Sequence, residues 1–144
     1  MGKLRVNKGL IRLEVNDDGE HIEFSPDVLF MERFQNFYDE LRVKEIEFME
    51  REAQINQNKD LDENGIPINS RDRINLTKEF CEWSREKIDG LFGNETCRKV
   101  FGNVLMPELI AEFLEQVVPY ITKTRSSVVS KYSKQSKGKK GVMK

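Results

Sequence analysis

The sequence has few of the residues that build metal or redox sites. Its 144 residues include one histidine, His21, and two cysteines, Cys81 and Cys97. A single histidine leaves no histidine cluster, and two cysteines without CxxC spacing cannot supply the four ligands of a structural zinc site. We therefore predict no metal and no cofactor, two reduced and largely buried thiols, and a histidine on an exposed face.

Long apolar runs are also missing. No stretch approaches the roughly eighteen apolar residues that a membrane-spanning helix needs. Met1 leads directly into alternating residues, without the apolar segment of a secretory signal. We expect a soluble protein of the cytoplasm that has no membrane partner.

Motifs for catalysis are lacking as well. The glycines near predicted helix ends do not have the lysine and hydroxyl spacing of a phosphate-binding loop. Residues 60–65 match the first half of a calcium-binding loop, but Arg71 stands where a glutamate should close the site. The acidic residues between Asp39 and Glu52 fall on the polar side of a predicted helix. Because no nucleophile has a nearby base, we predict that the protein is not an enzyme.

Charge is distributed unevenly along the chain. The last acidic residue is Glu115, so residues 116–144 carry +8, whereas residues 1–115 carry −9. Beyond Thr124 the chain is mostly serine, lysine and glycine, with too little apolar surface to order itself by burial. We expect one domain over residues 1–125 and a flexible, disordered basic tail over residues 126–144.

The N-terminal residues predict a β-hairpin. Residues 4–15 and 20–24 alternate between apolar and polar types around Asp18-Gly19, and Asp-Gly is typical of a two-residue hairpin turn. That turn would place Leu13 opposite Phe24 and put the apolar side chains on one face. A lone hairpin is marginal in water, so this one should pack on a helix or add strands from another copy.

The main predicted helix runs from Ser25 to about Gln57. Ser25 can cap it, and Pro26 suits its first turn. Apolar residues recur at helical spacing and form a wide aromatic stripe, which consists of Phe30, Phe34, Phe37, Tyr38, Leu41, Phe48 and Met49. Such a helix would be about 45 Å long at 1.5 Å per residue, longer than this domain needs. Its second half should therefore project or meet a partner.

Further helices follow a loop at about residues 56–70. The second helix should begin at Asn75 or Thr77, a short third helix follows, and the last opens at Pro107. Pro119 lies inside the last helical pattern and should kink or end it. The predicted fold is α+β and mostly α-helical, with the N-terminal hairpin packed on three to four helices.

Four segments occur together in a recognisable order. They are Phe24-Ser25-Pro26 with residues 30–38, residues 96–102, Glu112-Phe113, and Pro119-Tyr120-Ile121. This pattern resembles the tail assembly chaperones of long-tailed phages and prophages of Gram-positive bacteria. The resemblance extends over most of residues 4–125, and it involves structural positions rather than an active-site signature.

The resemblance implies a function in phage tail assembly. Such chaperones bind the long helical tape measure protein and keep it soluble while the tail tube polymerises. A longer form, made by ribosomal frameshifting, recruits the tail tube protein, and the chaperone is absent from the mature virion. We expect a homo-oligomer, and the candidate partner-binding residues are Phe34, Phe37, Tyr38, Leu41, Phe48 and Met49. The first four could instead form the core, so Phe48 and Met49 are the stronger candidates.

A regulatory or nucleic-acid-binding module that uses the basic tail is the alternative. Clustered lysines can neutralise phosphates and release counterions. However, the body is acidic, Tyr132 is the only aromatic residue of the tail, and no helix-turn-helix is evident. The sequence therefore favours a protein partner over a nucleic acid.

Overall fold

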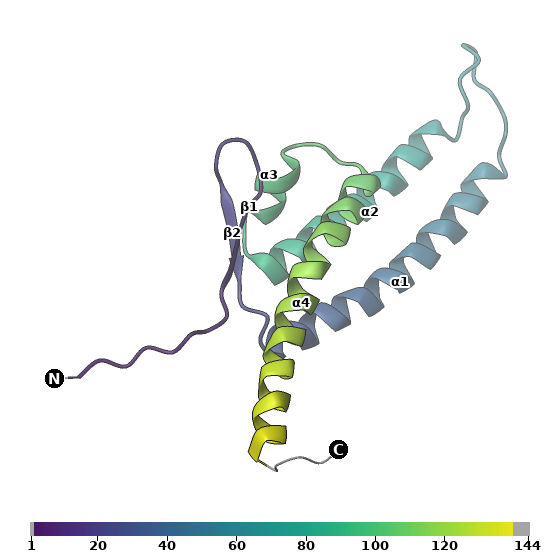
Figure 1. The fold of residues 1–144 in the computed structure, drawn as a ribbon. Coiled ribbons are helices and arrows are strands. Elements are labelled where there is room, and N and C mark those ends of the chain that lie inside the picture. The colour runs from purple at the N-terminus through teal and green to yellow at the C-terminus, as the bar shows by residue number, and fades with distance from the viewer. Residues whose placement is uncertain (1, 140–144) are drawn as a thin grey trace.

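The computed structural model describes residues 2–139, with side chains up to Lys123. Over this range the chain forms a two-stranded antiparallel sheet and four helices. These elements are β1 (Ile11–Glu14), β2 (His21–Phe24), α1 (Val28–Asn56), α2 (Ser70–Phe92), α3 (Thr96–Phe101) and α4 (Pro107–Lys139). In Figure 1, α1 and α2 run side by side and project well beyond the start of α4. The predicted mostly helical α+β fold with an N-terminal hairpin is confirmed.

The hairpin has the predicted apolar face, but its two strands pair in a different register. Leu13 pairs with Ile22, whereas the predicted turn paired it with Phe24, so that prediction is wrong by two residues. Side chains alternate with a period of two, and a shift of two therefore leaves the same residues on each face. Ile22 and Phe24 are buried in the core, which confirms the predicted face.

The turn explains the change of register. The Gly19 N–H donates to the carbonyl of Asn16 at 3.2 Å, so Asp17 and Asp18 are the central turn residues, not Asp18 and Gly19. The Asn16 side chain also accepts hydrogen bonds from the N–H groups of Asp18 and Glu20. Asparagine favours turns through such local bonds. Gly19 has φ 79°, a conformation that glycine adopts without strain.

Residues 2–10 do not belong to the sheet. The predicted first strand began at residue 4, but β1 begins at Ile11. The preceding segment leads away from the body of the molecule (Figure 1). Leu4 is 91% exposed, so this side chain does not anchor the segment to the core.

The first long helix begins later than predicted. Asp27 is its N-cap, and the Asp27 side chain accepts a hydrogen bond from the Phe30 N–H at 2.7 Å. The prediction that Ser25 caps the helix, with Pro26 in the first turn, is therefore wrong. An aspartate serves this position well because its carboxylate satisfies an unpaired N–H and also faces the positive end of the helix dipole.

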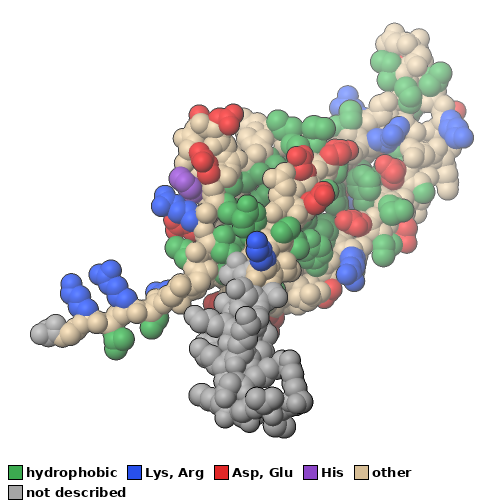
Figure 2. Space-filling view, in the orientation of Figure 1, with side chains coloured by type: hydrophobic (Ala, Val, Ile, Leu, Met, Phe, Trp, Pro, Cys, Tyr) green, Lys and Arg blue, Asp and Glu red, His purple; other side chains and the backbone are tan. Residues whose placement is uncertain are grey.

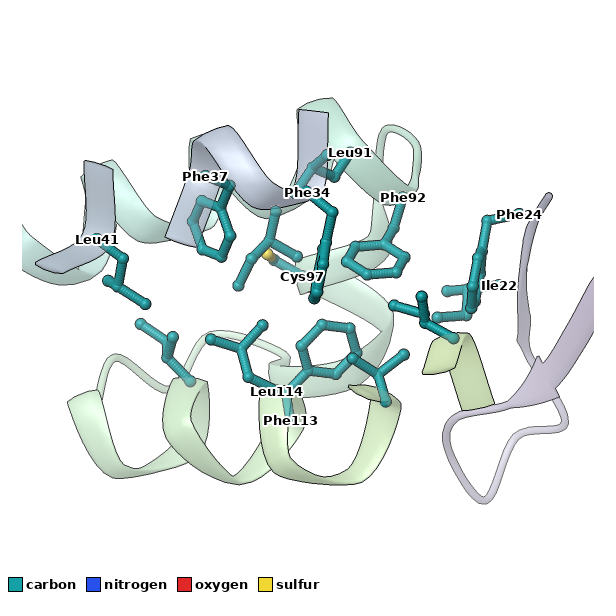
Figure 3. Close-up of a cluster of buried hydrophobic side chains, with 14 of the residues drawn as sticks. Ile22, Phe24, Phe34, Phe37, Leu41, Leu91, Phe92, Cys97, Phe113 and Leu114 are labelled. Atoms are coloured by element: carbon teal, nitrogen blue, oxygen red, sulfur yellow. The ribbon is translucent and has the colours of Figure 1, made fainter. Parts of the chain in front are cut away.

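Aromatic side chains from several elements meet in one core. The Phe24 ring of β2 lies 5.3 Å from Phe30 and 5.0 Å from Phe92, measured between ring centroids. Figure 3 shows side chains of α1, such as Phe34 and Leu41, pointing toward Leu114 of α4. The hairpin and the helices therefore share a single hydrophobic core.

The second helix begins earlier than predicted, directly after a loop over residues 57–69. Asn69 is 92% buried, and its side-chain amide donates to the carbonyls of Ile55, at 3.2 Å, and Asn58, at 2.8 Å. These bonds tie the end of α1 to the residue before α2, and α2 begins at Ser70 rather than at Asn75 or Thr77. The predicted loop at about 56–70 is confirmed.

The short third helix is tied to the second. The Cys97 N–H donates to the Asp89 carboxylate of α2 at 2.9 Å, and Gly102 ends the helix with φ 61°. Cys81 and Cys97 are both free and buried, as predicted. Burial, followed by the hydrogen bond with Asp89, raises the pKa of the Cys97 thiol to about 12. The thiol is therefore protonated and inert at neutral pH.

The hairpin is also fastened to α3. Asn16 donates to the carbonyl of Lys99 at 3.0 Å, and Arg98 forms an ion pair with Glu20 at 2.8 Å. This hydrogen-bonded arginine holds the pKa of Glu20 below its ordinary value of 4.5. Lys99 donates to the carbonyl of His21, and His21, expected on an exposed face, is half-buried.

The last helix opens at Pro107, as predicted, and does not end at Pro119. The predicted tail, residues 126–144, overlaps the end of α4, whose backbone extends to Lys139. Residues 140–144, and the side chains from residue 124 onward, lie outside the described residues. Among the described helices, none combines the length and the apolar character that crossing a membrane requires.

Candidate partner-binding surface

The distal half of the α1–α2 hairpin is held together within the chain. Phe48 of α1 faces Phe80 of α2, with ring centroids 5.4 Å apart. Farther toward the tip, Arg51 pairs with Glu79 at 2.8 Å. The predicted projection of the first helix is therefore a projection of two paired helices, and α2 is the neighbour that the second half of α1 meets.

One face of α2 is covered along only part of its length. Its residues follow the helical spacing of three and four that places side chains on one side, and they are Ile74, Thr77, Cys81, Ser84 and Ile88. Cys81, Ser84 and Ile88 are completely buried, whereas Ile74 is 65% exposed. The face is thus covered where the rest of the molecule packs on α2, and it continues uncovered toward the tip.

The uncovered part of this face forms a groove of about 550 Å³, which we call the distal groove. It lies between the distal half of the hairpin and the loop that leads into α4. Its lining residues are Glu52, Ser70, Arg73, Ile74, Leu76, Thr77, Lys78 and Leu105. Figure 2 shows hydrophobic side chains mixed with charged ones on the projecting hairpin. An apolar floor with a charged rim is the surface that an amphipathic helix can bind.

The loop before α4 adds apolar surface next to this groove. Val104, Leu105 and Met106 are consecutive and remain 49%, 38% and 46% exposed. Leu105 itself lines the distal groove. A helix in the groove would therefore contact α2 along one side and this loop at one end.

A second apolar strip lies on α1. Val43, Ile46 and Met49 are spaced by three residues and are 64%, 58% and 66% exposed. Residues three apart are neighbours on a helix surface, so these side chains form a short continuous strip. This strip offers an additional contact area for a partner.

The structure divides the sequence-predicted partner residues into groups. Phe34, Phe37 and Leu41 are buried in the core, and Tyr38 packs at its edge. Phe48 is half-buried against Phe80, while Met49 is exposed. The alternative that the sequence left open, a role in the core, thus describes Phe34, Phe37 and Leu41. Partner contact by Met49 remains a prediction.

Sequence reasoning missed Ile74 and Leu105. The reason is that the predicted start of α2 at Asn75 or Thr77 left Ile74 in a loop. Its spacing from Cys81 and Ile88, seven residues in each step, was the signal that could have placed it on the helix. The start of α4 at Pro107 was predicted, but no sequence pattern could have shown how α4 packs on α2 and that it leaves Ile74 uncovered.

The charged and metal-ligating side chains of the described residues determine what the surface could bind. Within the described part of the chain, no group of three histidine, cysteine, aspartate or glutamate side chains could hold a metal ion. The charged residues at the groove, Glu52, Arg73 and Lys78, are of both signs. The geometry therefore suits binding of a mixed apolar and polar surface.

Comparison with known proteins gives one match. A sequence model described as a family of unknown function, DUF6673, matches residues 19–143, from the hairpin turn through α4. No curated protein and no solved structure matches the chain.

Proposed function

We propose that this chain, which belongs to the DUF6673 family of unknown function, is a tail assembly chaperone that binds the tape measure protein of a long-tailed phage. In this proposal the chaperone keeps the tape measure soluble in the host cytoplasm until the tail tube encloses it. A longer frameshifted form would recruit the tail tube protein. The resemblance of residues 24–38 and 96–102 to such chaperones motivates the proposal.

The observation that carries the proposal is the distal groove. A tape measure protein is a long, largely helical chain, and such a chain exposes apolar stripes until its partners cover them. The distal groove extends the face of α2 that is buried at Cys81, Ser84 and Ile88. A helix placed there would cover Ile74 and Leu105 in the way that the core covers the rest of this face.

Co-expression tests the proposal. The full chain is expressed with the tape measure protein of a phage or prophage that encodes it, and the soluble fraction of the tape measure is measured. We expect the wild-type chain to keep the tape measure soluble and to co-purify with it. Ile74→Glu and Leu105→Glu should each reduce co-purification, because each places a charge on the apolar floor of the groove.

A matched variant controls for general surface effects. Leu29→Glu changes a side chain that is 69% exposed, close to the 65% of Ile74, but lies at the opposite end of α1 from the groove. This variant should keep the tape measure soluble. Equal loss in all three variants, or no solubilisation by the wild-type chain, would contradict the proposal.

A further inference from the structure

The N-terminal segment, residues 3–6, has the alternating basic and apolar residues of a β-strand but pairs with no strand in the described structure. Leu4 and Val6 alternate with Lys3 and Arg5, and the two apolar side chains are 91% and 75% exposed. Among the described residues, neither Lys3 nor Arg5 forms an ion pair. The segment leads away from its own sheet in Figure 1. In an extended conformation it would present apolar side chains on one side and positive charges on the other.

The outer edge of β1 is open. The Val15 N–H donates inward to the carbonyl of Glu20 at 2.9 Å. Backbone groups alternate in direction along an antiparallel strand, so those of Arg12 and Glu14 point away from β2. The sheet has only these two strands over the described residues. Exposed edges of this kind accept an added strand.

The apolar face is covered less well at β1 than at β2. Ile22 and Phe24 of β2 are only 3% and 5% exposed, whereas Ile11 and Leu13 of β1 are half-buried. The core-facing side chains of β1 are therefore more exposed than those of β2. A third strand beside β1 would complete their burial.

A groove of about 380 Å³ lies beside β1, between the hairpin and α4. Leu13, Val15, Leu109 and Tyr120 line it with apolar surface. Its lining also includes two exposed carboxylates, Glu14 and Glu112, which form no ion pair among the described residues. The groove thus combines an apolar floor with negative charge.

We propose that residues 3–6 of one copy add as a strand to the β1 edge of a second copy. Leu4 and Val6 would then face the apolar groove, and Lys3 and Arg5, on the opposite face of the added strand, would lie near Glu14. Backbone hydrogen bonds supply affinity in this mode of binding, while alternate side chains supply specificity. Reciprocal exchange between two copies closes a symmetric dimer.

This inference is independent of tape measure binding, because the groove beside β1 and the distal groove have no lining residue in common. Failure of one therefore leaves the other in place. The occupant is a second copy because the alternating basic and apolar side chains of the segment match Glu14 and the apolar groove, whereas the segment leads away from its own sheet in Figure 1.

Sedimentation velocity of the purified full chain over a range of concentrations tests the proposal. We expect a concentration-dependent dimer, and we expect the double variant Leu4→Asp, Val6→Asp to raise its dissociation constant by about tenfold or more. The matched control is Val28→Asp, Leu29→Asp, whose side chains are 67% and 69% exposed on α1 and lie outside the groove. This control should dimerise like the wild type.

Disulfide trapping identifies the contact. Chains carrying Leu4→Cys are mixed with chains carrying Tyr120→Cys under mild oxidation, and we expect covalent heterodimers. The native Cys81 and Cys97 are buried and do not interfere. A monomer at all concentrations, equal dimerisation of the segment and control variants, or no covalent heterodimer in the mixture would each overturn the proposal.

Discussion

Phe48 and Phe80 face each other across the helical hairpin, with ring centroids 5.4 Å apart. This contact lies beyond the main core, toward the tip, and neither residue belongs to the fully buried set. The two rings therefore hold together a part of the molecule that α4 does not reach. The distal groove depends on this pairing because Glu52 of α1 and residues 70–78 of α2 line it together, so the two antiparallel helices must stay side by side.

Removing one ring should loosen the tip without unfolding the body. Phe80→Ala deletes the half-buried partner of Phe48, and we expect a loss of about 1–2 kcal/mol, less than the 3–5 kcal/mol typical of a fully buried phenylalanine. Hydrogen exchange should speed up in residues 45–55 and 70–80 and stay unchanged in α3. Uniformly faster exchange throughout the chain would contradict this division between tip and body.

Asn69 should be the most sensitive polar residue of the hairpin. Its side-chain amide donates to the carbonyls of Ile55 and Asn58, and it is 92% buried. Asn69→Ala should lower the free energy of unfolding by about 1–2 kcal/mol, because it removes two part-buried hydrogen bonds that join the end of α1 and the following loop to the start of α2. Asn64→Ala, an exposed position in the same loop, is the control and should cost little. Urea denaturation measures both, and equal effects would be evidence against the role of Asn69.

The folded protein should become less stable at high pH because the Cys97 thiol loses its proton more easily in the unfolded chain. Burial and the neighbouring Asp89 raise the pKa of this thiol from 9.0 to about 12. The folded state therefore holds the proton more tightly than the unfolded state does. This contribution to stability is complete below pH 9 and is lost as the pH rises toward 12.

Comparison with Cys97→Ala isolates this effect from the titration of lysines and tyrosines. The variant has no thiol to titrate, so its urea midpoint should decrease less steeply over the same pH range than that of the wild type. Parallel pH profiles for the two proteins would show that Cys97 does not titrate differently in the folded and unfolded states.

The sequence predicted the elements of this fold better than their ends. Periodicity located the hairpin and the three long helices, because these patterns reflect burial on one face, and Pro107 marked the start of the last one. The errors at Ser25 and at Asn75 have a common cause. The Asp27 carboxylate caps α1, and the Asn69 amide ties the residue before α2 to the end of α1, both through specific hydrogen bonds that periodicity does not encode.

The candidate surface was less predictable than the fold. The residue type and spacing of Phe34 and Phe37 fit a binding stripe and a hydrophobic core equally well, and only tertiary packing distinguishes the two roles. Ile74 became visible as a surface residue because α4 begins at Pro107 and leaves the distal part of α2 uncovered. Such a relationship between distant segments has no local signature in the sequence.

The measurement that tests the central claim most directly is hydrogen exchange of the chain alone and in complex with the tape measure protein. We predict slower exchange on binding in residues 70–78 and at Leu105 and Met106, which line or adjoin the distal groove. Residues of α3 should be unaffected. No protection in these segments, or protection confined to the basic residues after Glu115, would contradict a helix-binding function of the distal groove.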